Sequence, residues 1–211
     1  MYRKTALIFV FIISVFSSLS IHAARPLVLI TTTMGDITVE LASYRAPGTV
    51  ANFLKYVDGK FYDNTVFHRI EQDFVVQGGG FDINYEYKET RRGIKNESDN
   101  GLENKRGTIA MARTDDVNSA NAQFYFNVKD NRSLDARFGR LGYTVFGKVL
   151  SGIEVIDAMS LVAVGSVEFV GNTVPVDPIV IKSIRVIEKT PEDSIKEEAN
   201  KPTTTKTEVQ K

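Results

Sequence analysis

The 211-residue chain contains no cysteine and no tryptophan, and it has only two histidines. The lack of cysteine excludes disulfides, cysteine nucleophiles and zinc sites built from thiolates. One histidine, His22, lies in the N-terminal segment described below, so His68 alone cannot build a histidine-cluster metal site. We therefore expect no bound metal and no cofactor.

The chain also lacks an excess of either charge, with 26 basic and 26 acidic residues. Residues 1–24 hold two of the bases and no acid, so their removal leaves 24 basic and 26 acidic residues, a formal charge of −2. Because binding to phosphate backbones needs an excess of Lys and Arg, this balance argues against nucleic acid as a partner.

Residues 1–24 have the three-part layout of a secretory signal peptide. Arg3 and Lys4 give a positive start, an apolar run covers residues 6–16, and a more polar stretch leads to Ala23 and Ala24. We predict cleavage after Ala23 or Ala24, export of the protein, and no stable membrane association afterwards. An uncleaved anchor helix is the alternative, although the apolar run is short for a membrane span.

The other end of the chain changes character after Lys189. Residues 190–211 are rich in Lys, Glu, Thr and Pro and carry almost no large apolar side chain. Such a segment cannot bury enough surface to fold, so we predict a disordered polar tail at 190–211 and a single folded domain at 25–189.

The predicted domain is mainly β. Residues 27–33 are rich in β-branched side chains, and Ile37, Val39 and Leu41 alternate with polar residues, which predicts a hairpin. The further predicted strands cover residues 65–70, 74–77, 108–111, 124–128, 145–150 and 180–188. The polar segment between Gly80 and Lys105 is predicted to be a long surface excursion.

Two helices are predicted. The first begins at Pro47, carries an apolar stripe and ends at Gly59; the stripe consists of Val50, Phe53, Leu54 and Val57. The second covers about 152–160, where Ser151 and Glu154 have the spacing of a capping box. Seven or eight short strands with two helices predict an antiparallel barrel with helices over its open ends.

Phe67-His68-Arg69-Ile70, followed by Phe74-Val75-Val76-Gln77-Gly78-Gly79, is the central motif of the chain. In a strand, Arg69 shares a face with Phe67, whereas His68 points the other way and is assigned a structural role. An arginine beside apolar residues is either simply solvated or placed there for chemistry. The run Gly78–Gly80 lacks the Gly-Lys-Ser/Thr of a phosphate loop and is interpreted as a turn.

This motif resembles the signature of the cyclophilins, which are peptidyl-prolyl cis–trans isomerases. The resemblance continues through 107–112, 122–126, Leu134-Asp135 and 143–149, and it covers roughly residues 26–189. It implies a closed eight-stranded antiparallel β-barrel capped by two α-helices. The stretch Gly107–Arg113 is most like bacterial periplasmic members, which implies a periplasmic location.

The resemblance also implies the site residues. Arg69 matches the catalytic arginine, and Gln77 matches the glutamine that binds the substrate backbone. The other positions that match substrate-binding residues of the family are Phe74, Val75, Met111, Ala112, Arg113, Gln123, Tyr125, Leu134 and Tyr143. Ser133, Tyr125 and Tyr143 depart from residues common in the family, which bears on inhibitor affinity more than on catalysis.

The function implied is acceleration of Xaa-Pro bond rotation during the folding of exported proteins. The expected partners are unfolded or partly folded proline-containing polypeptides, and the enzyme is expected to be a monomer. A chaperone module that binds proline-containing peptides with little catalysis is the alternative. A scaffold that recruits a partner through the segment 190–211 is a third possibility.

Overall fold

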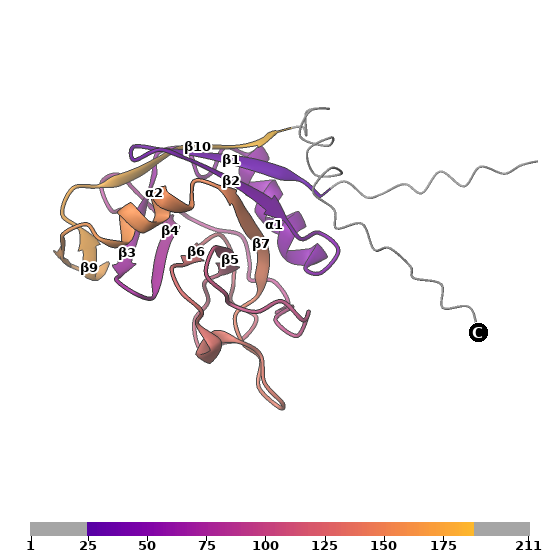
Figure 1. Cartoon of the computed structure of the whole chain (residues 1–211). Helices are drawn as coiled ribbons and strands as arrows, with labels where there is room; N and C mark the ends of the chain where they lie inside the picture. The colour runs from indigo at the N-terminus through magenta and orange to yellow at the C-terminus, as the bar shows by residue number, and fades with distance from the viewer. Residues whose placement is uncertain (1–24, 188–211) are drawn as a thin grey trace, which may run out of the picture.

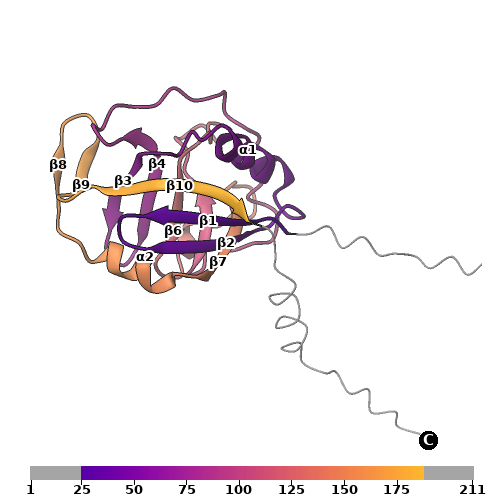
Figure 2. The ribbon, with the colours of Figure 1, turned by 90° about the horizontal axis from the view of Figure 1, so that it is seen from above.

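The computed structural model describes residues 25–187, so the predicted signal peptide and the predicted tail at 190–211 lie outside the described residues. Eight strands form a closed barrel in the order β1, β10, β3, β4, β6, β5, β7, β2 (Figures 1 and 2). Each neighbouring pair is antiparallel, and β2 closes the barrel by pairing with β1. The bounds are β1 Leu27–Thr32, β2 Asp36–Leu41, β3 Thr65–Glu71, β4 Val75–Asp82, β5 Thr108–Met111, β6 Phe124–Asn127, β7 Val145–Ser151 and β10 Ile179–Ile187.

Two α-helices and a short 3-10 helix accompany the barrel. Helix α1 (Pro47–Asp58) packs against β10, and α2 (Ile153–Ser160) packs against β2, β3 and β4. The 3-10 helix η1 covers Arg132–Leu134. These elements confirm the prediction of a mainly β, eight-stranded antiparallel barrel with two α-helices. Within residues 25–187, no helix has the length and apolar character needed to cross a membrane.

A group of packed aromatic side chains lies at the junction of α1 and the barrel. Phe53 of α1 packs against Tyr62, Phe124 and Phe146, with ring centroids 5.2, 5.8 and 5.2 Å away. These rings are all less than 2% exposed. Each buried aromatic side chain stabilises the fold by about 1.5–3 kcal/mol through burial alone, so this stack anchors α1 to the barrel.

The residues predicted to begin and end α1 are confirmed, whereas the capping box predicted for α2 is wrong. Pro47 is the first residue of α1, and Gly59 follows its last residue, with the Gly59 N–H donating to Lys55 O. In contrast, Ser151 ends β7, and the N-cap of α2 is Gly152, with no side-chain capping bond. Gly152 has a φ of 86°, and a Cβ there would lie 2.3 Å from Asp36 O, so the sharp turn leaves no room for a side chain.

Two further departures from the sequence-based predictions concern strands. Gly78–Gly80 is not a turn but part of β4, in which Gly78 pairs with Phe67 of β3 and with Phe124 of β6. A two-stranded sheet of β8 (Val164–Val167) and β9 (Gly171–Pro175) was not predicted. The segment between β4 and β5 is irregular as predicted, although it buries Asn96, Ser98 and Asn104.

Candidate functional site

The site is built on the hairpin of β3 and β4, where the strand register pairs Arg69 with Gln77. Arg69 Nη1 donates a hydrogen bond to Gln77 Oε1 at 3.1 Å, and Nη2 lies 2.5 Å from Glu71 Oε1. The Arg69 side chain is 37% exposed. Two partners therefore fix a permanently charged guanidinium at the surface, with further N–H groups left to donate.

The Gln77 side chain is itself hydrogen-bonded to a second side-chain amide, that of Gln123. Gln77 Nε2 donates to Gln123 Oε1 at 2.9 Å, which links β4 to the residue just before β6. A Cβ placed on Gly80 would come within 2.6 Å of Gln123 Cδ. The glycine in β4 therefore leaves the space that Gln123 occupies beside Gln77.

Arg69 also borders an apolar surface. Its Cζ lies 5.9 Å from the centroid of the Phe74 ring. Phe74 packs against a group of buried side chains that is separate from the main core, and we call this group the second apolar cluster. Its buried members are Val75, Ala110, Tyr125 and Val145, and the partly buried side chains around it are Phe74, Leu102, Ala112, Leu134 and Tyr143.

The second apolar cluster thus gathers six of the residues implied by the resemblance beside Arg69. Val75 and Tyr125 are buried in it, and Phe74, Ala112, Leu134 and Tyr143 lie at its margin. Arg69, Gln77 and Gln123 thus place fixed hydrogen-bond donors next to the second apolar cluster. This arrangement can bind a polar backbone and an apolar ring at the same time.

Met111 does not share this position. Its side chain is 1% exposed and packs in the main core, whereas Ala110, one residue earlier on β5, belongs to the second apolar cluster. The register agrees, because Ala110 lies opposite Tyr125 and Met111 lies opposite Phe124. Among the positions implied by the resemblance, the Met111 side chain is therefore not part of the second apolar cluster, because strand alternation turns it into the barrel.

Ala112 and Arg113 follow the end of β5. The Ala112 N–H donates to Gln123 O at 3.0 Å, which ties this segment to the amide pair. The Arg113 guanidinium lies 4.5 Å from the centroid of the Tyr143 ring and donates from Nε to Gly142 O at 3.1 Å. Arg113 therefore braces the segment that carries Tyr143.

A buried asparagine network supports the cluster from behind, and the sequence analysis missed it. Tyr125 Oη donates to Asn104 Oδ1 at 2.8 Å, and Asn104 Nδ2 donates to Asp135 Oδ1 at 3.0 Å. Asn131 Nδ2 donates to Phe74 O at 2.9 Å. Burial raises the pKa of Tyr125 well above its ordinary value, so its hydroxyl stays a donor. The network connects Tyr125, Phe74 and the residue that follows Leu134.

His68 is buried next to the site: the register of β3 shifts between Phe67 and Arg69, which breaks the predicted alternation, and the Gln123 side chain hydrogen-bonds His68. His68 is 4% exposed, and its ring centroid lies 4.7 Å from that of Phe81. Burial lowers its pKa to about 4, and the Val66 backbone and the Gln123 side chain oppose this shift only in part. His68 is therefore neutral at pH 7 and packs as an uncharged ring.

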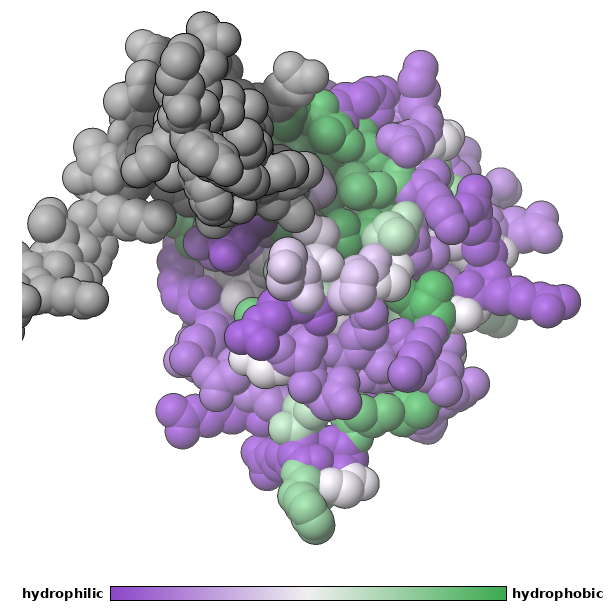
Figure 3. All heavy atoms as spheres, turned by 90° about the vertical axis from the view of Figure 1, so that its right-hand side faces the viewer, coloured by the Kyte–Doolittle hydropathy of each residue, from purple (hydrophilic) through white to green (hydrophobic). Residues whose placement is uncertain are grey.

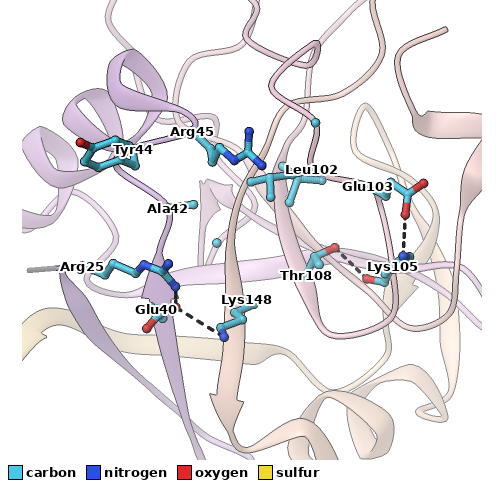
Figure 4. Close-up of a pocket in the computed structure, with 13 residues that line it drawn as sticks. Arg25, Glu40, Ala42, Tyr44, Arg45, Leu102, Glu103, Lys105, Thr108 and Lys148 are labelled. Atoms are coloured by element: carbon cyan, nitrogen blue, oxygen red, sulfur yellow. Dashed lines mark hydrogen bonds and ion pairs between the residues drawn. The ribbon is translucent and has the colours of Figure 1, made fainter. Parts of the chain in front are cut away.

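A cavity in the described part of the chain is lined by other residues than those that the resemblance implies for the Arg69 site (Figure 4). It has a volume of about 770 Å³, and its walls come from β2, β7, the start of β5 and the loops at 42–45 and 101–105. Glu40 forms ion pairs there with Arg25 at 2.9 Å and with Lys148 at 3.5 Å. Neither Arg69 nor Gln77 lines this cavity, so its size does not identify it as the site.

Comparisons with known proteins agree with the geometry. A family model described as cyclophilin type peptidyl-prolyl cis-trans isomerase/CLD matches residues 27–186. Peptidyl-prolyl cis-trans isomerase A of Dickeya dadantii is 49% identical over 162 residues, which cover 77% of this chain and 85% of that protein. Peptidyl-prolyl cis-trans isomerase B of Escherichia coli K12 is 44% identical over 160 residues, which cover 74% of this chain and 97% of that protein.

Solved structures give the same result. A cyclophilin-type peptidyl-prolyl cis-trans isomerase of Cryptosporidium parvum matches with a TM-score of 0.66 and 25% identity, over 79% of this chain and 99% of that chain. A structure of the same protein in the presence of the dipeptide Ala-Pro matches with a TM-score of 0.65 and 26% identity, over 77% of this chain and 99% of that chain. The chain therefore belongs to the cyclophilin-type peptidyl-prolyl cis–trans isomerases.

Proposed function

We propose that this peptidyl-prolyl cis–trans isomerase accelerates rotation about Xaa-Pro bonds in exported polypeptides while they fold, with Arg69 as its catalytic residue. The observation that carries the proposal is the position of the Arg69 guanidinium, held 3.1 Å from Gln77 Oε1 and beside Phe74. The Cryptosporidium relative whose structure was determined with Ala-Pro supports a proline-containing ligand.

The reaction makes and breaks no covalent bond, so it needs no nucleophile. Amide resonance gives a rotation barrier of ~18–20 kcal/mol, and uncatalysed exchange takes roughly tens to hundreds of seconds. Exchange in milliseconds requires about four to five decades of acceleration, which is roughly 5–7 kcal/mol. The enzyme must therefore bind the twisted amide more tightly than the planar one.

Arg69 can supply part of this difference. In the twisted state the proline nitrogen regains a lone pair that accepts a hydrogen bond, and Arg69 is a charged donor beside the apolar cluster. A hydrogen bond to a charged group contributes about 1.5–3 kcal/mol, and a preorganised donor contributes up to ~4 kcal/mol. We assign the remainder to proline burial against Phe74, Tyr125 and Leu134, and to Gln77 and Gln123 holding the backbone on one side.

A protease-coupled isomerisation assay on a short Xaa-Pro peptide tests the proposal directly. We expect Arg69→Ala to lower turnover by about one to three decades, and Arg69→Lys to restore only part of it, because a lysine lacks the fixed fork of donors. Arg92→Ala is the matched control, since Arg92 is an exposed arginine on an irregular segment. Circular dichroism would show that each variant is folded.

The outcomes separate the two candidate functions. Unchanged turnover in Arg69→Ala would remove Arg69 from the mechanism. A wild-type protein that binds the peptide without accelerating exchange would favour the alternative, a chaperone module that binds proline-containing segments. We keep the enzyme first because Arg69, Phe74 and Gln77 meet at one surface.

Export and the periplasmic location rest on the sequence of residues 1–24. N-terminal sequencing of the protein from a periplasmic fraction should begin at Ala24 or Arg25, and a start at Met1 would contradict cleavage. We also propose a monomer without stable membrane association after cleavage. Sedimentation of the processed protein would reveal a dimer if this were wrong.

A further inference from the structure

We propose that the tip of the loop between η1 and β7, residues 137–140, is a second contact point for the substrate polypeptide and favours substrates with acidic residues a few positions from the proline. The inference rests on the proposed function, because it assumes that the proline binds beside Leu134 and Tyr143. It adds a preference in the flanking sequence that the proline site itself does not provide.

The tip is a small structured hairpin. Arg137 N donates to Arg140 O at 2.9 Å, and Arg140 N donates to Arg137 O at 2.8 Å. Below it, Tyr143 N donates to Leu134 O at 2.9 Å, so the base of the loop is closed by two residues that border the second apolar cluster. Phe138 and Gly139 form the turn between the two arginines, and Gly139 has a φ of 76°. The tip is therefore fixed to the wall of the site.

This tip exposes an aromatic ring among cations. Phe138 is fully exposed, and no other described large apolar side chain is more so. The loop projects from the barrel at the lower edge of Figure 1, and the lowest projection in Figure 3 combines apolar and hydrophilic surface. A single exposed apolar residue is ordinary on a protein surface. A phenylalanine held between arginines is a different case, because both residue types are enriched where proteins bind polypeptides.

The cations of the tip have room for an acidic partner. Within residues 25–187, neither Arg140 nor the nearby Arg113 has a carboxylate within ion-pair distance, and both donate only to backbone carbonyls. Arg140 Nη2 donates to Ser133 O at 3.0 Å, next to Leu134. Arg137 is less available to an acidic substrate residue. It lines a hollow of about 730 Å³ together with three carboxylate side chains, those of Asp99, Glu103 and Asp135. Arg140 is therefore the main cation of the proposal.

The length of the loop determines how many positions from the proline an acidic substrate residue must lie to reach the tip. Phe138 is four residues from Leu134 and Arg140 is three residues from Tyr143, so each lies at most about 14 Å along the chain from the wall of the site. An extended peptide rises about 3.3 Å per residue. A substrate residue roughly three to five positions from the proline can therefore reach the tip, whereas a tetrapeptide cannot.

The experiment compares peptides of two lengths. Exchange rates are measured by NMR for a short Xaa-Pro tetrapeptide and for two twelve-residue peptides that carry Glu or Lys three to five positions on either side of the proline. For the wild type, we expect kcat/KM for the Glu peptide to exceed that for the Lys peptide about threefold to tenfold at low salt, a ratio typical of one or two exposed ion pairs. Raised salt should reduce this ratio.

The variants Arg140→Glu and Phe138→Ser isolate the tip. We expect both to lower kcat/KM for the Glu peptide about threefold to tenfold through KM, and to leave the tetrapeptide unchanged. The matched controls are Arg92→Glu and Phe169→Ser, which alter another exposed arginine and another exposed phenylalanine. These control variants should leave kcat/KM unchanged for both the Glu peptide and the tetrapeptide.

Each outcome decides the inference. Equal wild-type rates for the Glu and Lys peptides would overturn it, and so would tip variants that slow the tetrapeptide as much as the Glu peptide, because the tip would then only shape the proline site. A wild type that does not isomerise the tetrapeptide at all would instead overturn the proposed function.

Discussion

Arg69 and Gln77 face each other across β3 and β4, and the Arg69 guanidinium donates to Gln77 Oε1 at 3.1 Å. The same Gln77 side chain donates from Nε2 to Gln123 Oε1 at 2.9 Å. The orientation of the arginine therefore depends on an amide that is itself held by a second amide. This relationship makes the alignment of Arg69 testable without changing Arg69.

Gln77→Ala should reduce catalysis while the protein stays folded. The substitution removes one acceptor of Arg69 and one side chain proposed to hold the substrate backbone. Loss of a hydrogen bond to a charged group corresponds to about 1.5–3 kcal/mol, so kcat/KM should fall roughly tenfold to a hundredfold. Gln72→Ala, on the exposed turn of the same hairpin, is the matched control. A change of less than twofold in Gln77→Ala would contradict the prediction.

Gly80→Ala should act on the same site through Gln123. The new Cβ would lie 2.6 Å from Gln123 Cδ and 2.6 Å from Gln123 Cγ, so the amide must leave its place beside Gln77. We expect kcat/KM to fall about threefold to tenfold, with a stability loss of about 1–3 kcal/mol from overpacking.

Gly165→Ala provides the comparison for Gly80→Ala. Gly165 lies in β8, and the nearest atom to its new Cβ would be Val176 Cγ2 at 3.8 Å, which is ordinary contact. This variant should keep the wild-type activity in the isomerase assay. Equal activities of the two alanine variants would show that the position of Gln123 does not matter.

Much of the fold is encoded in local patterns that a reader of the sequence can see. The apolar stripe that includes Phe53, together with Pro47 and Gly59, predicts α1 at nearly its observed bounds, because the helix buries one face. Alternation at Ile37, Val39 and Leu41 likewise predicts β2. These elements require no knowledge of their partners.

Other features depend on residues that are distant in the sequence. The strand Thr108–Met111 is apolar at three successive positions, so alternation does not reveal that Ala110 faces the site and Met111 faces the core. Gly78 pairs with Phe67 and with Phe124, and local turn preferences contain no information about these partners. The contact of Asn104 with Tyr125 joins residues 21 positions apart, and an isolated asparagine gives no sign of it.

Tyr125→Phe should separate stability from catalysis. The ring that contributes to the second apolar cluster is kept, and only the hydroxyl bonded to Asn104 Oδ1 at 2.8 Å is lost. Asn104 Oδ1 still accepts from Asn127 Nδ2 at 3.2 Å, so the cost should stay near that of one neutral hydrogen bond, about 0.5–1.5 kcal/mol. Urea unfolding measures this loss, and the isomerase assay should show little change.

Tyr44→Phe is the matched control for the hydroxyl. Tyr44 is 84% exposed, so removal of its hydroxyl should leave the free energy of unfolding within about 0.5 kcal/mol of the wild type. If Tyr125→Phe were as stable as Tyr44→Phe, the asparagine network would not stabilise the fold. If Tyr125→Phe lost activity tenfold while staying folded, the hydroxyl would have a part in the site that the proposed mechanism lacks.

His68 should make the protein less stable as the pH falls from about 6.5 to about 4. Burial lowers its folded-state pKa to about 4, whereas an unfolded histidine has a pKa of about 6.5. Between these values the unfolded state binds a proton that the folded state does not, so the free energy of unfolding decreases with falling pH. The full effect is about 3 kcal/mol: it is absent above about pH 6.5 and complete below about pH 4.

Urea unfolding of His68→Gln and the wild type over this pH range isolates the contribution of His68 to the free energy of unfolding, because carboxylates and His22 are common to both proteins. The wild type should lose stability more steeply than the variant, and parallel curves would mean that His68 accepts a proton in the folded state as easily as in the unfolded chain.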